Sequence, residues 1–190
     1  MKTLYNVFPK SGTHIIQIHR GLLHKHIRLF DDDGEFLEPR RITNMIKGYR
    51  GDCTGHIPYD KHIEDWLHDH NYRHVFIHRD LRDTALSLAA YVKSAQHKQS
   101  EFNILLDDGK LLSEQDDVLL ACIYLVGNWY KRFIPWIEKA DAVYTYEELR
   151  GAALLLGRES ESATFRTGQS GAWRYKFKPH HKAAANEVLG

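Results

Sequence analysis

The sequence has few cysteines and no long apolar run. Only two of its 190 residues are cysteine, Cys53 and Cys122, so a disulfide framework is excluded and at most one bridge can form. Cys122 lies within an apolar helical pattern, where a buried free thiol is expected. No segment approaches the roughly 18 consecutive apolar residues of a membrane span, and no signal-peptide pattern stands at the N-terminus. These absences predict a soluble, cytoplasmic protein without a membrane partner.

The sequence also lacks an excess of charge of one sign. Lysine and arginine number 26 and aspartate and glutamate 25, which gives a net charge of +1 with the 13 histidines neutral. Neither a basic stripe nor a polybasic tract is present, so we expect no nucleic-acid partner. Any anion-binding site must therefore be built locally, from a few residues.

The alternation of apolar patterns predicts an α/β domain that spans residues 1–190. Short apolar runs predict strands at 3–7, 75–77 and 140–146. Amphipathic patterns predict the intervening helices, at 15–23, 58–70, 83–95, 116–140, 147–157 and 178–190. No element is predicted from the acidic turn at 29–41 to about residue 55, and residues 98–113 are expected to form a loop. Strands that alternate with helices at this spacing are typical of a mainly parallel sheet.

Polar and glycine residues mark several helix boundaries. Asp60 is a suitable N-cap for the helix at 58–70, and Asp83 or Thr84 is expected to begin the helix at 83–95. Ser113 followed by Asp116 resembles a capping box and is expected to open the long helix. Pro135 should kink or break that helix, because proline lacks the N–H that a helix interior needs.

A polar residue or loop follows each of the three predicted strands. Residues 10–13 follow the first strand, Arg79 the second and Tyr146 the third. Ligands of open parallel sheets bind beyond the carboxyl ends of the strands, where loops lead into helices. We therefore expect these residues to meet at one edge of the sheet.

The first of these loops has the parts of a phosphate cradle. A helix N-terminus attracts anions, Gly12 allows close backbone approach, Ser11 and Thr13 add hydroxyls, and Lys10 adds a full charge. No glycine precedes the lysine at the distance that a nucleoside-triphosphate P-loop requires. Taken alone, the loop is equally compatible with an ordinary strand-to-helix turn that carries an exposed lysine.

Four short segments follow one another in the order of a known family. They are "PKSGT" at 9–13, "RDLRDTALS" at 79–87, "YEEL" at 146–149 and "FRTGQSGAW" at 165–173. In this order they resemble the motifs of sulfotransferases that use 3′-phosphoadenosine-5′-phosphosulfate (PAPS), and the final "WRYKFKPHHKAAANEVLG" resembles that family's C-terminal end. The resemblance implies a three-layer, P-loop-like domain with a mainly parallel central sheet flanked by helices.

The resemblance also implies a donor site, with PAPS as co-substrate and no metal. The lysine loop would hold the 5′-phosphosulfate, the arginines and the serine the 3′-phosphate, and the tyrosine the adenine. His14 replaces the family's usual second threonine, and its imidazole is expected to take over that phosphate contact. The residues assigned in this way are Lys10, Ser11, Gly12, Thr13, His14, Arg79, Ser87, Tyr146, Arg166, Thr167 and Gly168, with Gly171 and Trp173 completing the last motif.

The catalytic residues implied by the resemblance are His56 and Lys10. His56 lies in "TGHIPYD", which resembles the family's "HLP" segment, and would accept the proton of the attacking hydroxyl. Lys10 would stabilise the leaving phosphate during an in-line displacement. The acceptor would be a hydroxyl, or as a second choice an amine, of a small or carbohydrate-like molecule. The short stretch from Glu147 to Phe165 implies an open acceptor pocket, or one completed by the second subunit of a homodimer.

Three other functions fit parts of the sequence. His68, His70 and His74 lie close together and invite a metal site, although no H-E-x-x-H motif is present. A module that binds adenosine bisphosphate without catalysis would keep Arg79 and Ser87 but would need no base. A small kinase would require a Walker-type lysine and a carboxylate for magnesium, and the sequence offers no clear position for either.

Overall fold

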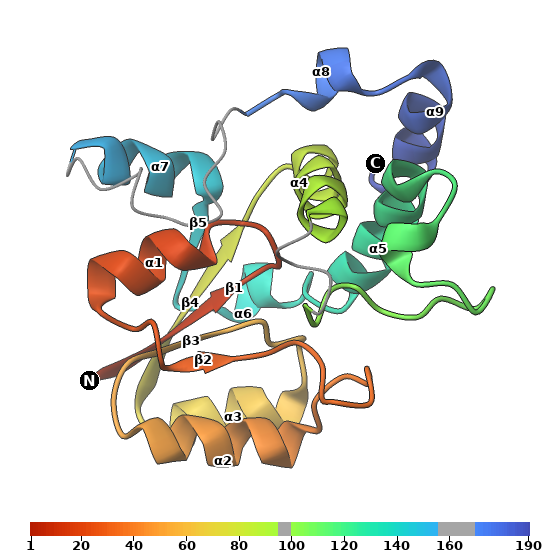
Figure 1. Cartoon of the computed structure of the whole chain (residues 1–190). Coiled ribbons are helices and arrows are strands. Elements are labelled where there is room, and N and C mark those ends of the chain that lie inside the picture. The colour runs from red at the N-terminus through yellow and green to blue at the C-terminus, as the bar shows by residue number, and fades with distance from the viewer. Residues whose placement is uncertain (95–99, 156–169) are drawn as a thin grey trace.

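A sheet of five parallel strands forms the centre of the computed structural model, which describes residues 1–94, 100–155 and 170–190 (Figure 1). The strand order is β2-β3-β1-β4-β5, and each of the four pairings is parallel. The strands are β1 (Lys2–Val7), β2 (His26–Ile27), β3 (Cys53–Gly55), β4 (Tyr72–His78) and β5 (Ala142–Thr145). The predicted fold class is confirmed.

Helices cover both faces of this sheet and make a three-layer structure. Helices α1 and α7 share one apolar cluster with the sheet, whereas α2, α3, α4 and α5 contribute to the larger cluster (Figure 1). Helices α4, α5 and α9 pack together beside the sheet. The helices are α1 (Thr13–Arg20), α2 (Pro39–Tyr49), α3 (Lys61–Asp69), α4 (Leu81–Lys93), the 3₁₀ turn η2 (Leu112–Glu114), α5 (Val118–Lys131), α6 (Trp136–Lys139), α7 (Tyr146–Leu155), α8 (Trp173–Lys176) and α9 (Pro179–Val188).

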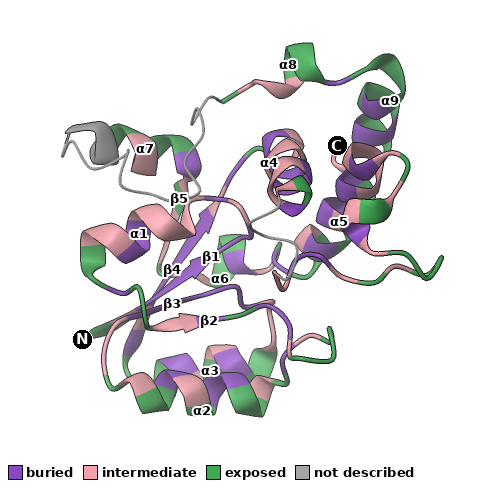
Figure 2. Cartoon of the chain, in the orientation of Figure 1, coloured by how far each residue is buried: buried purple, intermediate pink, exposed green. Residues whose placement is uncertain are grey.

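The two central strands bury side chains on both faces. Successive side chains of a strand point to opposite sides, so Leu4 and Phe76 enter the larger cluster while Tyr5, Val7 and Val75 enter the smaller one. Figure 2 shows β1 and β4 buried along most of their length. Burial on both faces explains why these segments read as continuous apolar runs in the sequence.

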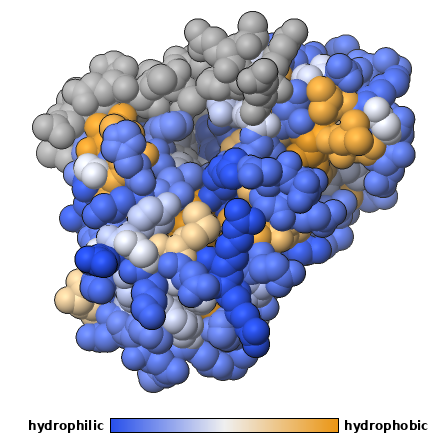
Figure 3. Space-filling view, turned by 60° about the horizontal axis from the view of Figure 1, so that its bottom comes forward, coloured by the Kyte–Doolittle hydropathy of each residue, from blue (hydrophilic) through white to orange (hydrophobic). Residues whose placement is uncertain are grey.

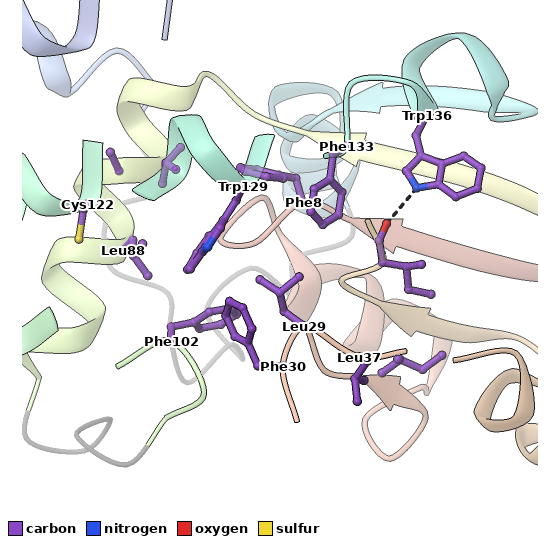
Figure 4. Packing of buried hydrophobic residues seen from close by; sticks show 14 of the residues in the cluster. Phe8, Leu29, Phe30, Leu37, Leu88, Phe102, Cys122, Trp129, Phe133 and Trp136 are labelled. Atoms are coloured by element: carbon purple, nitrogen blue, oxygen red, sulfur yellow. Dashed lines mark hydrogen bonds between the residues drawn. The ribbon is translucent and has the colours of Figure 1, made fainter. Parts of the chain in front are cut away.

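The larger cluster also fixes the chain segment that follows β3. Trp136 is fully buried, and its indole Nε1 donates a hydrogen bond to the carbonyl oxygen of Ile57 at 2.9 Å (Figure 4). Phe8 packs edge-on against Phe133, with ring centres 5.1 Å apart. The first residues after β1 and after β3 are thereby held by the same rigid core.

Two predicted helix starts are wrong. In the first the cap is an aspartate upstream of the predicted residue, and in the second it is an aspartate downstream of it. Asp80, rather than Asp83 or Thr84, caps α4 and accepts from the N–H groups of its first turn. Asp117 caps α5 by accepting from Leu120 N at 3.0 Å, so Ser113 does not open that helix. A cap must lie at the geometric start of the helix, and a sequence with several nearby aspartates does not fix that position.

Other boundaries agree with prediction more closely. The Asp60 cap of α3 is confirmed by its bond from His62 N at 2.8 Å. The break at Pro135 is confirmed, because α5 ends at Lys131 and α6 begins at Trp136. Helix α1 begins two residues and ends three residues earlier than predicted. It ends early because Gly21 adopts a left-handed conformation (φ 64°) that terminates it. The predicted end of α7 at Gly157 lies outside the described residues.

One face of the molecule, shown in Figure 3, is mostly hydrophilic. Figure 3 shows hydrophobic residues only in separate, smaller areas of this face. Among the described helices, none is both long and apolar enough to cross a bilayer.

Candidate functional site

The parallel strands bring their carboxyl ends to one edge of the sheet, and the predicted site residues follow those ends. His56 comes directly after β3, Lys10 after β1, Arg79 after β4 and Tyr146 after β5, which are neighbouring strands in that order. Four candidate residues from separate segments therefore follow the carboxyl ends of adjacent strands, where parallel sheets bind their ligands.

The loop between β1 and α1 is a tight turn with an uncapped helix start. Lys10 (φ 64°) and Gly12 (φ 103°) both adopt left-handed conformations, which are unusual for a lysine. Gly12 occupies the N-cap position and offers no side chain to the first N–H groups of α1. The Ser11 hydroxyl is fully buried and makes no hydrogen bond to any residue that the structure describes. A buried hydroxyl beside uncapped amides is suited to an anion.

Tyr146 closes this loop from the side. A Cβ atom at Gly12 would lie 3.1 Å from Tyr146 Cδ2, so only glycine permits this approach without displacement of the ring. The guanidinium carbon of Arg79 lies 4.2 Å from the centre of the same ring, in a cation–π contact. Arg79 and Tyr146 are both buried. The structure thus brings Gly12, Arg79 and Tyr146 together, as expected for residues that would bind one ligand.

Helix α4 carries the remaining predicted residue of the described donor site. Ser87 is half-buried in the second turn of α4. One turn earlier, the buried carboxylate of Asp83 accepts hydrogen bonds from Gly171 N at 2.5 Å and from Trp173 N at 3.3 Å. Asp83 therefore anchors the start of α8 on α4, a role that the sequence did not reveal. Its signal in the sequence was a carboxylate one helical turn before Ser87.

The last predicted motif is only partly described. Arg166, Thr167 and Gly168 lie outside the described residues, whereas Gly171 and Trp173 are held by Asp83.

His56 is buried and has a defined tautomer. Its Nδ1 lies 2.6 Å from the carbonyl oxygen of Val7. A carbonyl only accepts, so Nδ1 carries the hydrogen and Nε2 keeps its lone pair. Burial lowers the pKa of His56 well below its ordinary value, the neighbouring His26 lowers it further, and the Val7 bond opposes both effects. His56 is therefore neutral at pH 7, in the form that can accept a proton.

Several charged or ionisable groups surround this imidazole. The charges of Lys10 and His14 both lower the pKa of His56. Burial lowers the pKa of His26 to about 4, and His14 lowers it as well. Burial raises the pKa of Glu101, against hydrogen bonds from backbone N–H groups and the charge of Lys10. His26 and Glu101 were not predicted from sequence, because they lie in segments without a recognisable pattern.

The catalytic candidates lie beside an aromatic wall. The Lys10 ammonium lies 3.4 Å from the centre of the Tyr91 ring, a cation–π contact. Phe102 packs against both Tyr91 and His56, with ring centres 6.1 Å and 5.6 Å away. Lys10, Thr13 and His14 are half-buried and so remain within reach of a ligand.

The three histidines considered for a metal site do not converge. The His68 side chain is 90% exposed, and His70 stacks on Trp66 with ring centres 4.1 Å apart. His74 lies in β4 and packs against Trp136, where burial lowers its pKa to about 3. Among the described residues, these three do not form a group with ligand spacing.

Comparison with known proteins identifies the fold. No protein-family model matches the chain, and no curated protein matches its sequence. The structure of mouse sulfotransferase SULT7A1 complexed with PAP is similar with a TM-score of 0.61 at 17% identity, over 99% of this chain and 82% of that one. A structure of retinol dehydratase in a complex with retinol and PAP is similar with a TM-score of 0.52 at 12% identity, over 99% and 80% of the two chains. The chain therefore has the fold of the sulfotransferases.

Proposed function

We propose that the protein is a sulfotransferase that transfers the sulfuryl group of PAPS to a hydroxyl of a small acceptor molecule. The observation that carries the proposal is the pairing of an anion cradle with a neutral imidazole on adjacent strand ends. Lys10 and the uncapped start of α1 form the cradle, and His56 supplies the imidazole. Both similar structures named above were solved with PAP, which supports a nucleotide of this kind as the ligand.

The 5′ end of the donor would lie on the loop after β1. The N–H groups that begin α1 would bind phosphate oxygens, together with the buried Ser11 hydroxyl and the hydroxyl of Thr13. His14 would add a further donor from the same helical turn. Gly12 would allow the phosphate to approach the backbone closely.

The 3′-phosphate and the adenine would lie toward β4 and β5. Arg79 would bind the 3′-phosphate through its planar fork, with Ser87 of α4 as a second donor. The resemblance assigns Arg166, Thr167 and Gly168, which lie outside the described residues, to the same phosphate. Tyr146 already contacts Arg79, so it is suitably placed for the adenine ring.

His56 and Lys10 would divide the chemistry between them. Nε2 of His56 would take the proton from the acceptor hydroxyl as its oxygen forms a bond to sulfur and the bond from sulfur to the phosphate oxygen breaks. The departing phosphate oxygen would carry the electron pair, and the charge of Lys10 would stabilise it. The Val7 carbonyl would hold the imidazole in the reactive tautomer throughout.

The aromatic wall favours an acceptor that carries a ring or another apolar group. Tyr91 and Phe102 flank Lys10 and His56, so an acceptor that approaches His56 would lie against these rings. One similar structure contains retinol, an apolar alcohol, which supports a small molecule with a hydroxyl group.

The proposal is tested by the formation of adenosine 3′,5′-bisphosphate from PAPS, measured with a panel of phenols, aliphatic alcohols, sugars and amines. We expect turnover that depends on the acceptor, and a fall of about 10²- to 10³-fold in kcat for Lys10→Ala. Lys61→Ala is the matched control, because Lys61 lies on α3 and is exposed. A protein that binds the bisphosphate but shows no turnover across the panel would instead be a non-catalytic binding module.

A further inference from the structure

Two histidines and a glutamate from distant segments meet at the end of the sheet. They are His26 of β2, His56 after β3 and Glu101, which follows α4 in the chain. One ring nitrogen of each histidine and one carboxylate oxygen of Glu101 all lie within 4.8 Å of one another. The two imidazoles are perpendicular, with ring centres 4.7 Å apart. We refer to these three residues as the His26–His56–Glu101 cluster.

The hydrogen bonds of the two histidines leave the same nitrogen available in each ring. His56 donates from Nδ1 to the Val7 carbonyl. His26 Nδ1 lies 2.9 Å from Thr54 Oγ1, and the Thr54 hydroxyl donates its own hydrogen to the carbonyl oxygen of Lys25. With the Thr54 hydroxyl donating to Lys25, His26 donates from Nδ1 to Thr54, and this is the tautomer in which the cluster can bind a metal. In this arrangement both rings keep a lone pair on Nε2.

The carboxylate of Glu101 is fixed by backbone donors. Its Oε2 accepts from Leu29 N at 2.8 Å and from Phe30 N at 3.5 Å. These bonds hold the carboxylate beside the two imidazoles, although Glu101 is separated from both by more than forty positions in the sequence. The cluster thus consists of three electron-pair donors, each anchored from behind.

We propose that the His26–His56–Glu101 cluster is a binding site for a divalent transition-metal ion of the Zn²⁺ type. Two imidazole nitrogens and one carboxylate are a recurrent set of protein ligands for zinc. A carbonyl or hydroxyl partner behind each imidazole is the usual outer shell of such ligands, and here Val7 and Thr54 supply it. Ligands of a tetrahedral zinc lie about 3.4 Å apart, so binding would draw the three atoms together by no more than about 1.4 Å.

The ligand atoms of the cluster determine which ions it would select. The charges of Lys10 and His14 act on His56, and that of His14 acts on His26 as well, which opposes a hard cation held by charge alone. Imidazole nitrogens favour Zn²⁺, Cu²⁺ or Ni²⁺, whereas Mg²⁺ and Ca²⁺ prefer oxygen ligands. The site would therefore bind Zn²⁺ and exclude Mg²⁺.

A second histidine cluster in the molecule lacks this arrangement. Asp117, His180 and His181 also lie within ligand distance of one another. There the Asp117 carboxylate already accepts from Nε2 of both histidines, at 2.9 Å and 2.8 Å, and also caps α5. His181 Nδ1 in turn accepts from Lys178 N. These groups satisfy one another without an ion, so this cluster provides an internal control.

Metal binding at His56 has a consequence that rests on the proposed function. An ion would occupy the Nε2 lone pair that the acceptor proton needs, so the metal-loaded protein would lose its base. The ion would then be an inhibitor of sulfuryl transfer and not a participant in it. The site itself is independent of this consequence, because its geometry is defined without reference to the reaction.

The test is a titration of chelator-treated protein with Co²⁺, followed by visible absorption, and with Zn²⁺, followed by calorimetry. We expect one ion per chain, and an affinity at least about 100-fold weaker in His26→Ala and in Glu101→Gln. The glutamine variant keeps the shape of the side chain and an oxygen for the Leu29 N–H group, so it should remain folded. His180→Ala should bind the ion as the wild type does.

Two results would overturn the metal site. One is wild-type protein that takes up neither ion, and the other is binding that survives in Glu101→Gln but is lost in His180→Ala. Titration of the same samples with adenosine 3′,5′-bisphosphate separates this failure from failure of the proposed function. Protein that binds the nucleotide but no metal would refute only the metal site.

Discussion

Replacement of Gly12 by alanine tests the geometry of the proposed phosphate loop. Gly12 has a φ of 103°, and a Cβ atom there would lie 3.1 Å from Tyr146. A left-handed conformation costs an alanine about 1–2 kcal/mol, and crowding against the ring adds about 1 kcal/mol. We therefore expect Gly12→Ala to lower the free energy of unfolding by about 2–3 kcal/mol, measured by urea denaturation.

Gly34→Ala is the matched control for this substitution. Gly34 has a φ of 83°, but nothing lies within 4 Å of the position that its Cβ would take. Its variant should lose only the conformational part, about 1–2 kcal/mol. Gly12→Ala should also bind adenosine 3′,5′-bisphosphate at least about 10-fold more weakly, a loss of about 1.4 kcal/mol, because it displaces Tyr146. Equal losses of stability in the two variants, with unchanged nucleotide binding in both, would refute the reasoning.

Three further predictions concern residues at or near the site. His56→Ala should lower kcat by about 10²- to 10⁴-fold with little change in affinity for the bisphosphate, whereas exposed His70→Ala should change neither. Asp83→Asn should lower the free energy of unfolding, measured by urea denaturation, by about 2 kcal/mol, because the buried carboxylate accepts two backbone N–H bonds. The exposed control, Asp65→Asn, should change it by less than about 1 kcal/mol. Burial would raise the pKa of Asp117, but hydrogen bonds from two histidines and a backbone N–H hold it below its ordinary value. A carboxyl group whose pKa is lower in the folded protein than in the unfolded chain stabilises the fold at pH values above its unfolded pKa. The free energy of unfolding of the wild type should therefore exceed that of Asp117→Asn by less and less as the pH falls below about 4. A constant difference across that range would contradict this assignment.

The sequence predicted the long helices and the strands whose side chains are apolar on both faces of the sheet. β1, β4 and β5 read as apolar runs, and α3 and α5 as amphipathic or apolar periodic segments. The region from 24 to 55 was not predicted, because β2 has only two residues and β3 only three, too few for a period to emerge. Helix α2 does carry Ile42, Ile46 and Tyr49 on one face, but residues of low helix propensity between them weaken the pattern.

The site shows the same division between local and long-range information. The positions of Lys10, Arg79 and Tyr146 at one sheet edge follow from parallel strands, and the sequence alone predicted that they would meet. The hydrogen bond of Asp83 with Gly171 and the approach of Glu101 to His26 join residues that are 88 and 75 positions apart in the sequence. No local pattern encodes such contacts, so they could be found only in the structure.

The measurement that tests the central claim most directly is a calorimetric titration with adenosine 3′,5′-bisphosphate, with AMP and ATP for comparison. The bisphosphate differs from AMP by the 3′-phosphate, and one charge-assisted bond from Arg79 is worth about 1.5–3 kcal/mol, or about 10- to 150-fold in affinity. We predict this preference in the wild type and in Arg41→Ala, whose exposed side chain lies on α2, and its loss in Arg79→Ala. Equal affinity for the bisphosphate and AMP, or a preference that survives in Arg79→Ala, would contradict the proposed donor site.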